Sequence, residues 1–324
     1  MARSAESYST VQYYIRHGKS IHNGTGIFYG GSPDGAKNGR VYLIDDGRRQ
    51  ACTTGWLMRN LGVEVLEMYH SPLVRTTQTA ELSAAAYGLS GKTLLPNFHE
   101  INHGKLQFAR LPTGTANAQR AETVSIFSEA LGSFKGMDNE LVAKFAGWVV
   151  PNGWGDGESY FDASRRADDA TRSLQNRSNI ALVGHNGLMR QMRALFSVVN
   201  FAGREELAAE HAAILEVSEI TKENVAAACV EKGRGPNPEV LRALFMPFAE
   251  ASVSLVKLLG ALSVPAIGDV VQDGRTLGNG TIARVGIRED GILVRDQLWT
   301  PEVFNETVGL TSDSFTITPG SDWV

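Results

Sequence analysis

Charged and imidazole side chains follow predicted strands at several places in this sequence. Arg16 and His17 come directly after an apolar run that ends at Ile15, and Glu100 and His185 follow two other such runs. Because ligands of an open α/β sheet bind at the carboxyl ends of its strands, these side chains are expected to meet in one crevice. A guanidinium can bind two phosphate oxygens at once and an imidazole can be a nucleophile, so the set suits phosphoryl transfer.

Each of these groups has a distinct role in the chemistry that we expect. A neutral His17 can attack phosphorus directly, while Arg16 and Arg75 neutralise charge on the phosphoryl oxygens. His185, as an imidazolium, would be a further donor to the same anion, and Glu100 would protonate the leaving oxygen and then deprotonate water. Arg75 is expected in the first turn of a helix, where a bound anion would explain a cation at the positive end of the helix dipole.

Alternating strand and helix patterns predict the elements that position these residues. Strands are expected at Val11–Ile15, Val63–Tyr69, Thr93–Phe98 and Ile180–Val183, with a hairpin of Thr281–Ile287 and Gly291–Val294 about the turn Asp290-Gly291. Four helices are expected. The first spans 45–60, and the second starts at Pro72 with Ser71 as its cap. The third spans 160–174 with Glu158 and Ser159 as caps, and the fourth runs from after Gly187 through Leu195. This alternation predicts an α/β fold.

Three regions do not follow the alternating pattern. Gly24–Gly39 reads as a long loop beside the site, either substrate-facing, with Asn23, Phe28 and Tyr29 as candidates, or a mobile excursion. Residues 111–152 contain mixed helical segments, and residues 201–269 are predicted to form a helical insertion or cap. We therefore expect a catalytic domain of residues 8–200 plus 270–300, the insertion, and a C-terminal tail of residues 301–324.

The composition is that of an ordinary globular protein, with 43% apolar and 20% charged residues among 324. A net charge of −4 gives no overall basic field, so neither nucleic acid nor a membrane is an expected partner. Any anionic ligand must then be bound by a local group of arginines. The first residues have no apolar signal core and no apolar run approaches a membrane span, so the cytoplasm is the expected location.

The motifs, taken in order, resemble those of the histidine phosphatase superfamily, which also contains the cofactor-dependent phosphoglycerate mutases. The matching segments are Arg16–Ser20 with Asn23, Gly47–Ala51, Ser71–Ala80, Glu100 with Gly104, Gly157–Ser159, and Gly184-His185. The resemblance implies a three-layer α/β/α sandwich, His17 as the phosphorylated nucleophile, and no metal, so that no cofactor is expected; the predicted helical insertion is larger than a minimal family member needs. It also implies that Arg16, Arg75, His185 and Asn23 bind the phosphoryl group, with Glu100 as the proton donor.

The segment Ile101–Leu106 resembles the phosphatase branch more than the mutases, whose additional tyrosine-containing pattern it lacks. We therefore expect a metal-independent phosphatase that hydrolyses a small phosphate monoester through a phosphohistidine on His17. Two alternatives stay open: a phosphoglycerate mutase-like phosphotransferase, and a non-catalytic protein that binds a phosphorylated ligand. The expected partner is a small phosphorylated substrate, and the sequence gives no oligomeric state. The remaining histidines, His22, His70, His99, His103 and His211, lack the spacing of a metal site.

Overall fold

The computed structural model describes residues 8–23, 25, 27, 29–31, 41–104, 107, 157–158, 160–189, 192, 209, 277–287 and 293–301. The predicted mixed helical region of residues 111–152 and the turn Asp290-Gly291 lie outside this part of the chain. So do the predicted insertion, apart from Ala209, and the predicted tail, apart from Pro301. The division into a catalytic domain, an insertion and a tail therefore stays a prediction.

The described strands form one sheet in the order β3-β2-β4-β1-β5-β6. They are β1 (Thr10–Arg16), β2 (Glu67–His70), β3 (Thr93–Leu94), β4 (Ile180–Gly184), β5 (Ile282–Ile287) and β6 (Leu293–Trp299). The neighbours from β3 to β1 pair in parallel, whereas β5 pairs antiparallel with both β1 and β6. The predicted mostly parallel sheet and its antiparallel hairpin are confirmed.

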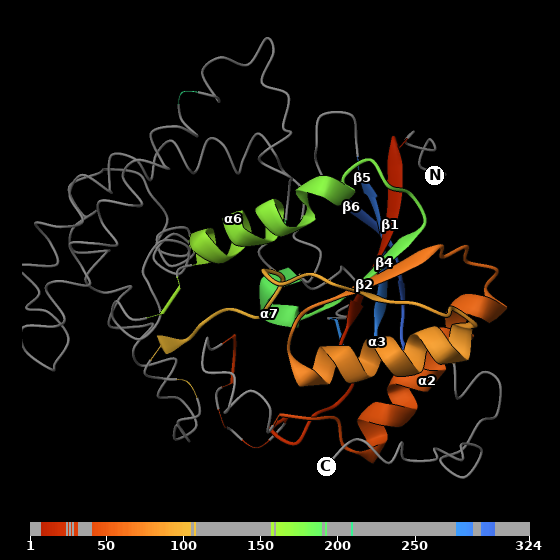
Figure 1. Ribbon diagram of the computed structural model, residues 1–324, viewed down its shortest axis with the longest axis horizontal. Helices are drawn as coiled ribbons and strands as arrows, with labels where there is room; N and C mark the ends of the chain where they lie inside the picture. Colours follow the sequence, from red (N-terminus) through yellow and green to blue (C-terminus); the bar gives the residue numbers. More distant parts are fainter. Residues whose placement is uncertain are drawn as a thin grey trace, which may run out of the picture.

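Helices cover both faces of the sheet (Figure 1). On one face lie α2 (Asp45–Asn60) and α3 (Val74–Tyr87), and on the other lie α6 (Tyr160–Thr171), the 3-10 turn η3 (Arg172–Leu174) and the short α7 (Asn186–Met189). Alternate residues of each strand point to opposite faces, so each face has its own buried apolar cluster. The three-layer α/β/α sandwich is confirmed.

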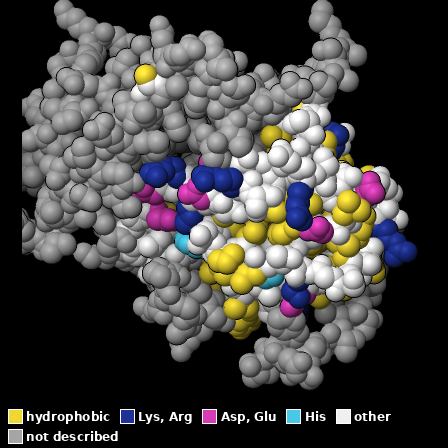
Figure 2. Space-filling view, turned by 45° about the horizontal axis from the view of Figure 1, so that its top comes forward, with side chains coloured by type: hydrophobic (Ala, Val, Ile, Leu, Met, Phe, Trp, Pro, Cys, Tyr) yellow, Lys and Arg dark blue, Asp and Glu magenta, His cyan; other side chains and the backbone are white. Residues whose placement is uncertain are grey.

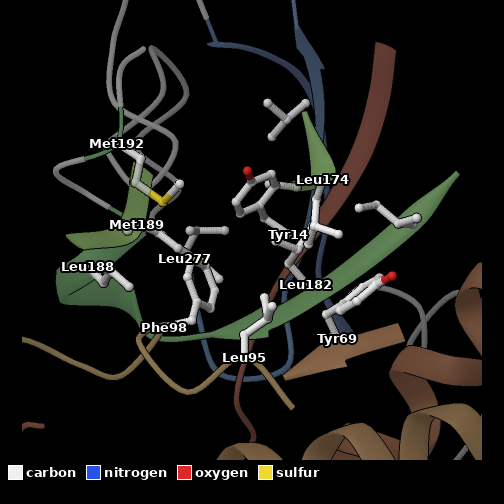
Figure 3. Close-up of a cluster of buried hydrophobic side chains, with 14 of the residues drawn as sticks. Tyr14, Tyr69, Leu95, Phe98, Leu174, Leu182, Leu188, Met189, Met192 and Leu277 are labelled. Carbon is white, nitrogen blue, oxygen red and sulfur yellow. The ribbon is translucent and has the colours of Figure 1, made fainter. Parts of the chain in front are cut away.

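The two buried clusters show how the alternation works in β1. Tyr13 and Ile15 pack with side chains of α2 and α3, including Met58 and Ala84. Tyr14, between them in the strand, packs on the opposite face with side chains that include Ala163 of α6. Figure 3 shows that this second cluster also contains Tyr69, Leu182, Phe98 and Leu188. Both clusters lie directly beneath the strand ends that carry the site.

Two predicted strands are shorter in the structure. The predicted strand 63–69 begins only at Glu67, because the backbone N–H groups of Val63 and Val65 donate to Met58 O and Tyr87 Oη, and not to a neighbouring strand. The predicted strand 93–98 comprises only Thr93 and Leu94. The chain then turns, with the Phe98 N–H donating to Leu95 O. The first difference arises from contacts with residues outside the predicted strand, and the second from a local turn.

The predicted start of α3 is wrong, whereas the position of Arg75 in its first turn is confirmed. The helix begins at Val74 with Leu73 as its N-cap, so neither Ser71 nor Pro72 has the predicted capping position. The predicted helix after Gly187 is described only as Asn186–Met189, and Met192 is not helical. None of the helices in the described residues has the length and apolar character needed to cross a bilayer.

Candidate active site

The carboxyl ends of β1 and β4 bring His17 and His185 together. Arg16 lies opposite Gly184 in the parallel register, so the residue after each is a histidine at the same edge of the sheet. The His17 N–H donates to Gly184 O over 3.1 Å, and the two imidazole centroids are 5.3 Å apart. Both side chains are buried, with 3% and 0% of their surfaces exposed. The prediction that these strand ends meet is confirmed.

The His17 imidazole is held in one tautomer. Its Nδ1 lies 2.7 Å from the carbonyl oxygen of Gly18, which can only accept, so Nδ1 carries the proton and Nε2 keeps a lone pair. Burial, then the charges of Arg75 and Arg16, lower the pKa of His17 well below its ordinary value, although the bond to Gly18 acts in the opposite direction. A neutral imidazole with a free Nε2 is the form that a nucleophile requires.

The loop after His17 is fixed by side chains from three different parts of the chain. Three consecutive backbone N–H groups each donate to a side-chain oxygen at 2.7–3.0 Å: Gly18 to Thr79 Oγ1, Lys19 to Gln50 Oε1, and Ser20 to Asn23 Oδ1. These three N–H groups do not bond to the backbone of a neighbouring strand, so the side-chain oxygens act as their acceptors. Thr79 and Gln50 belong to the motif segments 71–80 and 47–51, which gives those segments a physical role.

Glycine at positions 18 and 47 allows the loop to approach the first turn of α2. A Cβ atom on Gly18 would lie 2.2 Å from Gly47 O, and one on Gly47 would lie 1.9 Å from Lys19 O. Both distances are far below van der Waals contact and involve backbone atoms. A side chain at either position would therefore displace the loop that carries His17.

Arg75 is a fully buried cation. Its side chain is 0% exposed, and none of its three guanidinium nitrogens has a hydrogen-bond partner in the described part of the protein. The guanidinium carbon lies 4.9 Å from the ring centroid of Tyr29, within the range of a cation–π contact. Burial lowers the pKa of Arg75 to about 10, with Arg16 acting in the same direction and Tyr29 and Glu100 opposing it. A group of this kind requires an anion with several acceptor oxygens.

Arg16 lies at the same edge of the sheet and is only partly bonded. Its Nη1 donates to Leu277 O over 2.6 Å, whereas its buried Nε has no partner in the described residues. Burial lowers the pKa of Arg16, and the nearby Tyr29 and Glu100 partly offset this effect. The charges of Arg16 and Arg75 both lower the pKa of His17, so both guanidiniums act electrostatically on the predicted nucleophile.

His185 is positioned by a residue that sequence reasoning assigned to another role. Its Nε2 lies 2.8 Å from the hydroxyl of Ser71, and its buried Nδ1 has no partner within the described residues. Burial and then the charge of Arg75 lower the pKa of His185 well below its ordinary value. Ser71 follows β2 at the same sheet edge as the histidines. Because Ser71 follows a predicted strand, its sequence position was the signal that could have identified it as a site residue.

Glu100 lies half-buried with its carboxylate against the start of α7. Oε1 accepts the N–H groups of Leu188 at 2.8 Å and Ile101 at 3.0 Å, and Oε2 accepts that of Gly187 at 3.1 Å. A Cβ atom on Gly187 would be 2.7 Å from Oε1, so glycine permits this approach. Its charge raises the pKa of both site arginines, which places Glu100 in the same electrostatic neighbourhood. Its role as proton donor stays a prediction.

Asn23 is engaged mainly in the local loop. Its Oδ1 accepts from both the N–H and the hydroxyl of Ser20, and that hydroxyl also lies 3.0 Å from Tyr29 Oη. Asn23 thus helps to place Tyr29, the residue over Arg75, while its amide NH₂ is the group that could donate to a phosphate. The predicted phosphate contact of Asn23 therefore stays a prediction. Of the other loop candidates, Phe28 lies outside the described residues.

Ser159 lies outside the described residues, so the predicted capping of α6 stays a prediction, whereas Glu158 has partners far along the chain. Its carboxylate accepts from the N–H of Asn102 and pairs with Arg166, so it contacts the segment that carries Glu100. The described residues contain no group of three or more His, Cys, Asp or Glu side chains placed to hold a metal ion. Among the described side chains on the face shown in Figure 2, basic and acidic groups are interspersed and form no patch of one sign.

A comparison with protein families agrees with this geometry. The sequence profile described as the histidine phosphatase superfamily (branch 1) matches residues 12–230, which is 219 of the 324 residues. The chain belongs to the histidine phosphatase superfamily. The resemblance inferred from the motifs is thereby confirmed. No protein of curated function matches this superfamily member at a significant level.

Several solved structures are similar to this histidine phosphatase superfamily member. A mycobacterial glucosyl-3-phosphoglycerate phosphatase in complex with VO₃ has a TM-score of 0.47 and 16% identity, over 90% of this chain and 98% of that one. Mycobacterial hydrolase 1 has a TM-score of 0.47 and 14% identity, over 90% and 98%. A phosphoserine phosphatase mutant of Entamoeba histolytica in complex with phosphoserine has a TM-score of 0.44 and 15% identity, over 90% and 98%. Family membership rests on the sequence profile, since these structures are distant.

Proposed function

We propose that this protein is a phosphatase that hydrolyses a small phosphate monoester through a phosphohistidine on His17. The observation that carries the proposal is Arg75, a fully buried guanidinium whose three nitrogens have no partner in the described residues. A buried cation without hydrogen-bond acceptors is costly, and a phosphate dianion supplies both negative charge and acceptors. The two neighbouring histidines make this anion site suitable for chemistry and not only for binding.

In the first step, Nε2 of His17 attacks the phosphorus of the substrate. A P–N bond forms as the bond from phosphorus to the ester oxygen breaks, and Glu100 gives its proton to that departing oxygen. Arg16, Arg75 and Nδ1 of His185, which lacks a partner among the described residues, bind the equatorial oxygens, where negative charge is spread in the transition state. The Nδ1–H bond to Gly18 O stabilises the positive charge that develops on the His17 ring.

In the second step, water replaces His17 on phosphorus. Glu100, now a carboxylate, accepts a proton from the water as its oxygen attacks, the P–N bond breaks, and inorganic phosphate leaves. His17 returns to the neutral Nδ1–H tautomer. The full cycle consumes one ester and one water and releases an alcohol and phosphate. It needs no group beyond the described side chains.

A colorimetric assay with p-nitrophenyl phosphate tests this proposal directly. Wild type should release p-nitrophenol, and His17→Ala should lose the activity down to the background rate while unfolding at a similar temperature. Phosphohistidine is hydrolysed in acid but survives in alkali, so the reaction with ³²P-labelled substrate is quenched in alkali. The label should then be found on His17. Equal rates in the two proteins, or a label on another residue, would refute the role of His17.

The same trapping experiment separates hydrolysis from mutase activity. A phosphatase loses the label from His17 to water within its turnover time, whereas a mutase must keep its phosphoenzyme from water and pass the group to another hydroxyl. Persistence of the label over many turnover times, with transfer to an added alcohol, would favour the mutase. A non-catalytic binding protein would give neither product nor label.

A further inference from the structure

The segment that carries Glu100 has no regular secondary structure of its own. Residues 97–102 form neither helix nor strand, so no ladder of backbone bonds fixes them. Three of their carbonyl groups bond instead to one side chain of α6. Arg166 donates from Nη1 to Asn97 O at 2.7 Å and to His99 O at 2.9 Å, and from Nη2 to Glu100 O at 3.4 Å.

Glu158 completes this arrangement from the other end of the segment. Its two carboxylate oxygens accept from Nε and Nη2 of Arg166 at 2.7 and 2.8 Å, which is a bidentate pair. The same carboxylate accepts the N–H of Asn102 at 2.9 Å, and the Glu158 N–H donates to Asn102 O at 2.8 Å. The side chains of Arg166 and Glu158 are only 15% and 19% exposed.

The ion pair therefore holds the backbone on both sides of Glu100. Arg166 bonds to the carbonyls of residues 97, 99 and 100, and Glu158 bonds to residue 102, while the carboxylate of Glu100 lies on the opposite side against Gly187 and Leu188. Rotation or sliding of the segment would break several of these bonds together. We propose that Arg166 and Glu158 are positioning residues that hold Glu100 in place for proton transfer to the leaving group, an inference that rests on the proposed function.

The chemistry explains why a loose segment would matter. A general acid acts only when its proton lies within hydrogen-bond reach of the leaving oxygen. A displacement of about 1 Å at a catalytic group can cost about a hundredfold in rate. The planar fork of arginine can bond to a carboxylate and several carbonyls simultaneously, whereas the ammonium of lysine has three donors and no fixed plane. Arg166→Lys should therefore keep the charge and lose the positioning.

Leaving-group dependence distinguishes positioning of an acid from a general structural role. p-Nitrophenolate leaves without protonation, whereas an alkoxide does not, so only substrates with poor leaving groups need the acid. We would measure kcat/KM for p-nitrophenyl phosphate, phenyl phosphate and benzyl phosphate in wild type, Arg166→Lys, Glu158→Gln and His17→Ala. Because kcat/KM covers the steps through leaving-group release, slow hydrolysis of the phosphoenzyme does not affect it.

Asp169 near the end of α6 and Arg172 in the adjoining η3 provide matched controls. They also form an ion pair, but with side chains 60% and 57% exposed. Arg166→Lys should lower kcat/KM for benzyl phosphate by about tenfold to a hundredfold and that for p-nitrophenyl phosphate by less than about threefold. Glu158→Gln retains an acceptor for the Asn102 N–H and is the second variant in case Arg166→Lys does not fold. It should show the same pattern more weakly. Arg172→Lys and Asp169→Asn should show no such pattern.

An equal loss on all three substrates in both Arg166→Lys and Glu158→Gln would overturn the positioning role, as would unchanged rates on benzyl phosphate. These outcomes leave the proposed function intact as long as His17→Ala is inactive. Full activity of His17→Ala would instead refute the proposed function itself. The two failures are therefore separated within one set of measurements.

Discussion

Replacing Arg75 with methionine should abolish activity and make the unliganded protein more stable. The guanidinium is fully buried and has no hydrogen-bond partner in the described part of the protein, so its charge opposes folding. Most substitutions in a protein core destabilise it, by about 1 kcal/mol on average. A gain in stability here would therefore identify a residue retained for binding an anion.

The size of the gain follows from the environment of Arg75. Burial, the largest cause, lowers its pKa from the ordinary value above 12 to about 10, which corresponds to about 3 kcal/mol against folding with the charged form. Because the folded-state pKa is the lower one, this cost is complete at neutral pH and disappears only above the unfolded-state pKa. Loss of the cation–π contact with Tyr29 offsets about 1–2 kcal/mol for a buried pair, so we expect a net gain of about 1–2 kcal/mol.

Urea unfolding of wild type and Arg75→Met at pH 7.5 measures this difference. Adding vanadate or phosphate at a hundred times its Kd should raise the free energy of unfolding of wild type by about 2.7 kcal/mol and should leave that of Arg75→Met unchanged. Arg177→Met is the matched control, because Arg177 is 51% exposed and pairs with Glu67, and its stability should change by less than about 1 kcal/mol. A loss of several kcal/mol in Arg75→Met, with the phosphate response retained, would refute the reasoning.

Three further predictions test the framework of the site. Gly47→Ala should lower kcat/KM at least tenfold and stability by about 1–3 kcal/mol, because its Cβ would lie 1.9 Å from a backbone oxygen, whereas Gly91→Ala, with nothing within 4 Å, should change neither. Ser71→Ala should lower kcat/KM about tenfold by freeing the second histidine, while Ser83→Ala, which loses an equally buried 2.8 Å bond outside the site, should affect stability alone. Because the pKa of His17 is well below its ordinary value, unfolding takes up a proton there and stability falls by about 1.4 kcal/mol per unit as pH drops below about 6.5. His17→Asn should remove that share of the slope in urea titrations at pH 6.5 and 5.5, and an unchanged slope would contradict the pKa assignment.

The meeting of the site residues could be predicted from the sequence for a simple reason. Arg16, His17 and His185 each follow an apolar run, and in a parallel sheet the carboxyl ends of neighbouring strands lie at one edge. That inference needs the strand ends but not the partners of individual side chains. For β2 the inference held because only the start of the strand was mispredicted, whereas β3 ends at Leu94, so Glu100 does not directly follow a strand as predicted.

The supporting contacts could not be predicted in this way. Ser71 reads as a helix cap in its local sequence, yet its hydroxyl bonds to His185, 114 residues away. Arg166 reads as a polar position on an amphipathic helix, yet it bonds to the carbonyls of residues 97, 99 and 100. Glu158 similarly resembles a cap and contacts Asn102. Residue spacing in the sequence indicates the possible local partner of each of these polar groups. It does not indicate the distant partner, which only the folded chain brings into contact.

The sequence by itself therefore determined the class of chemistry and the edge of the sheet where it occurs, because residue types and hydrophobic periodicity are local properties. Tertiary structure alone decided which tautomer His17 adopts, that Arg75 is buried without a hydrogen-bond partner among the described residues, and which side chains hold Glu100. The physical reason is that burial and hydrogen-bond partners depend on what the packed elements place next to each group. These surroundings set the pKa values and positions through which the same residues can act.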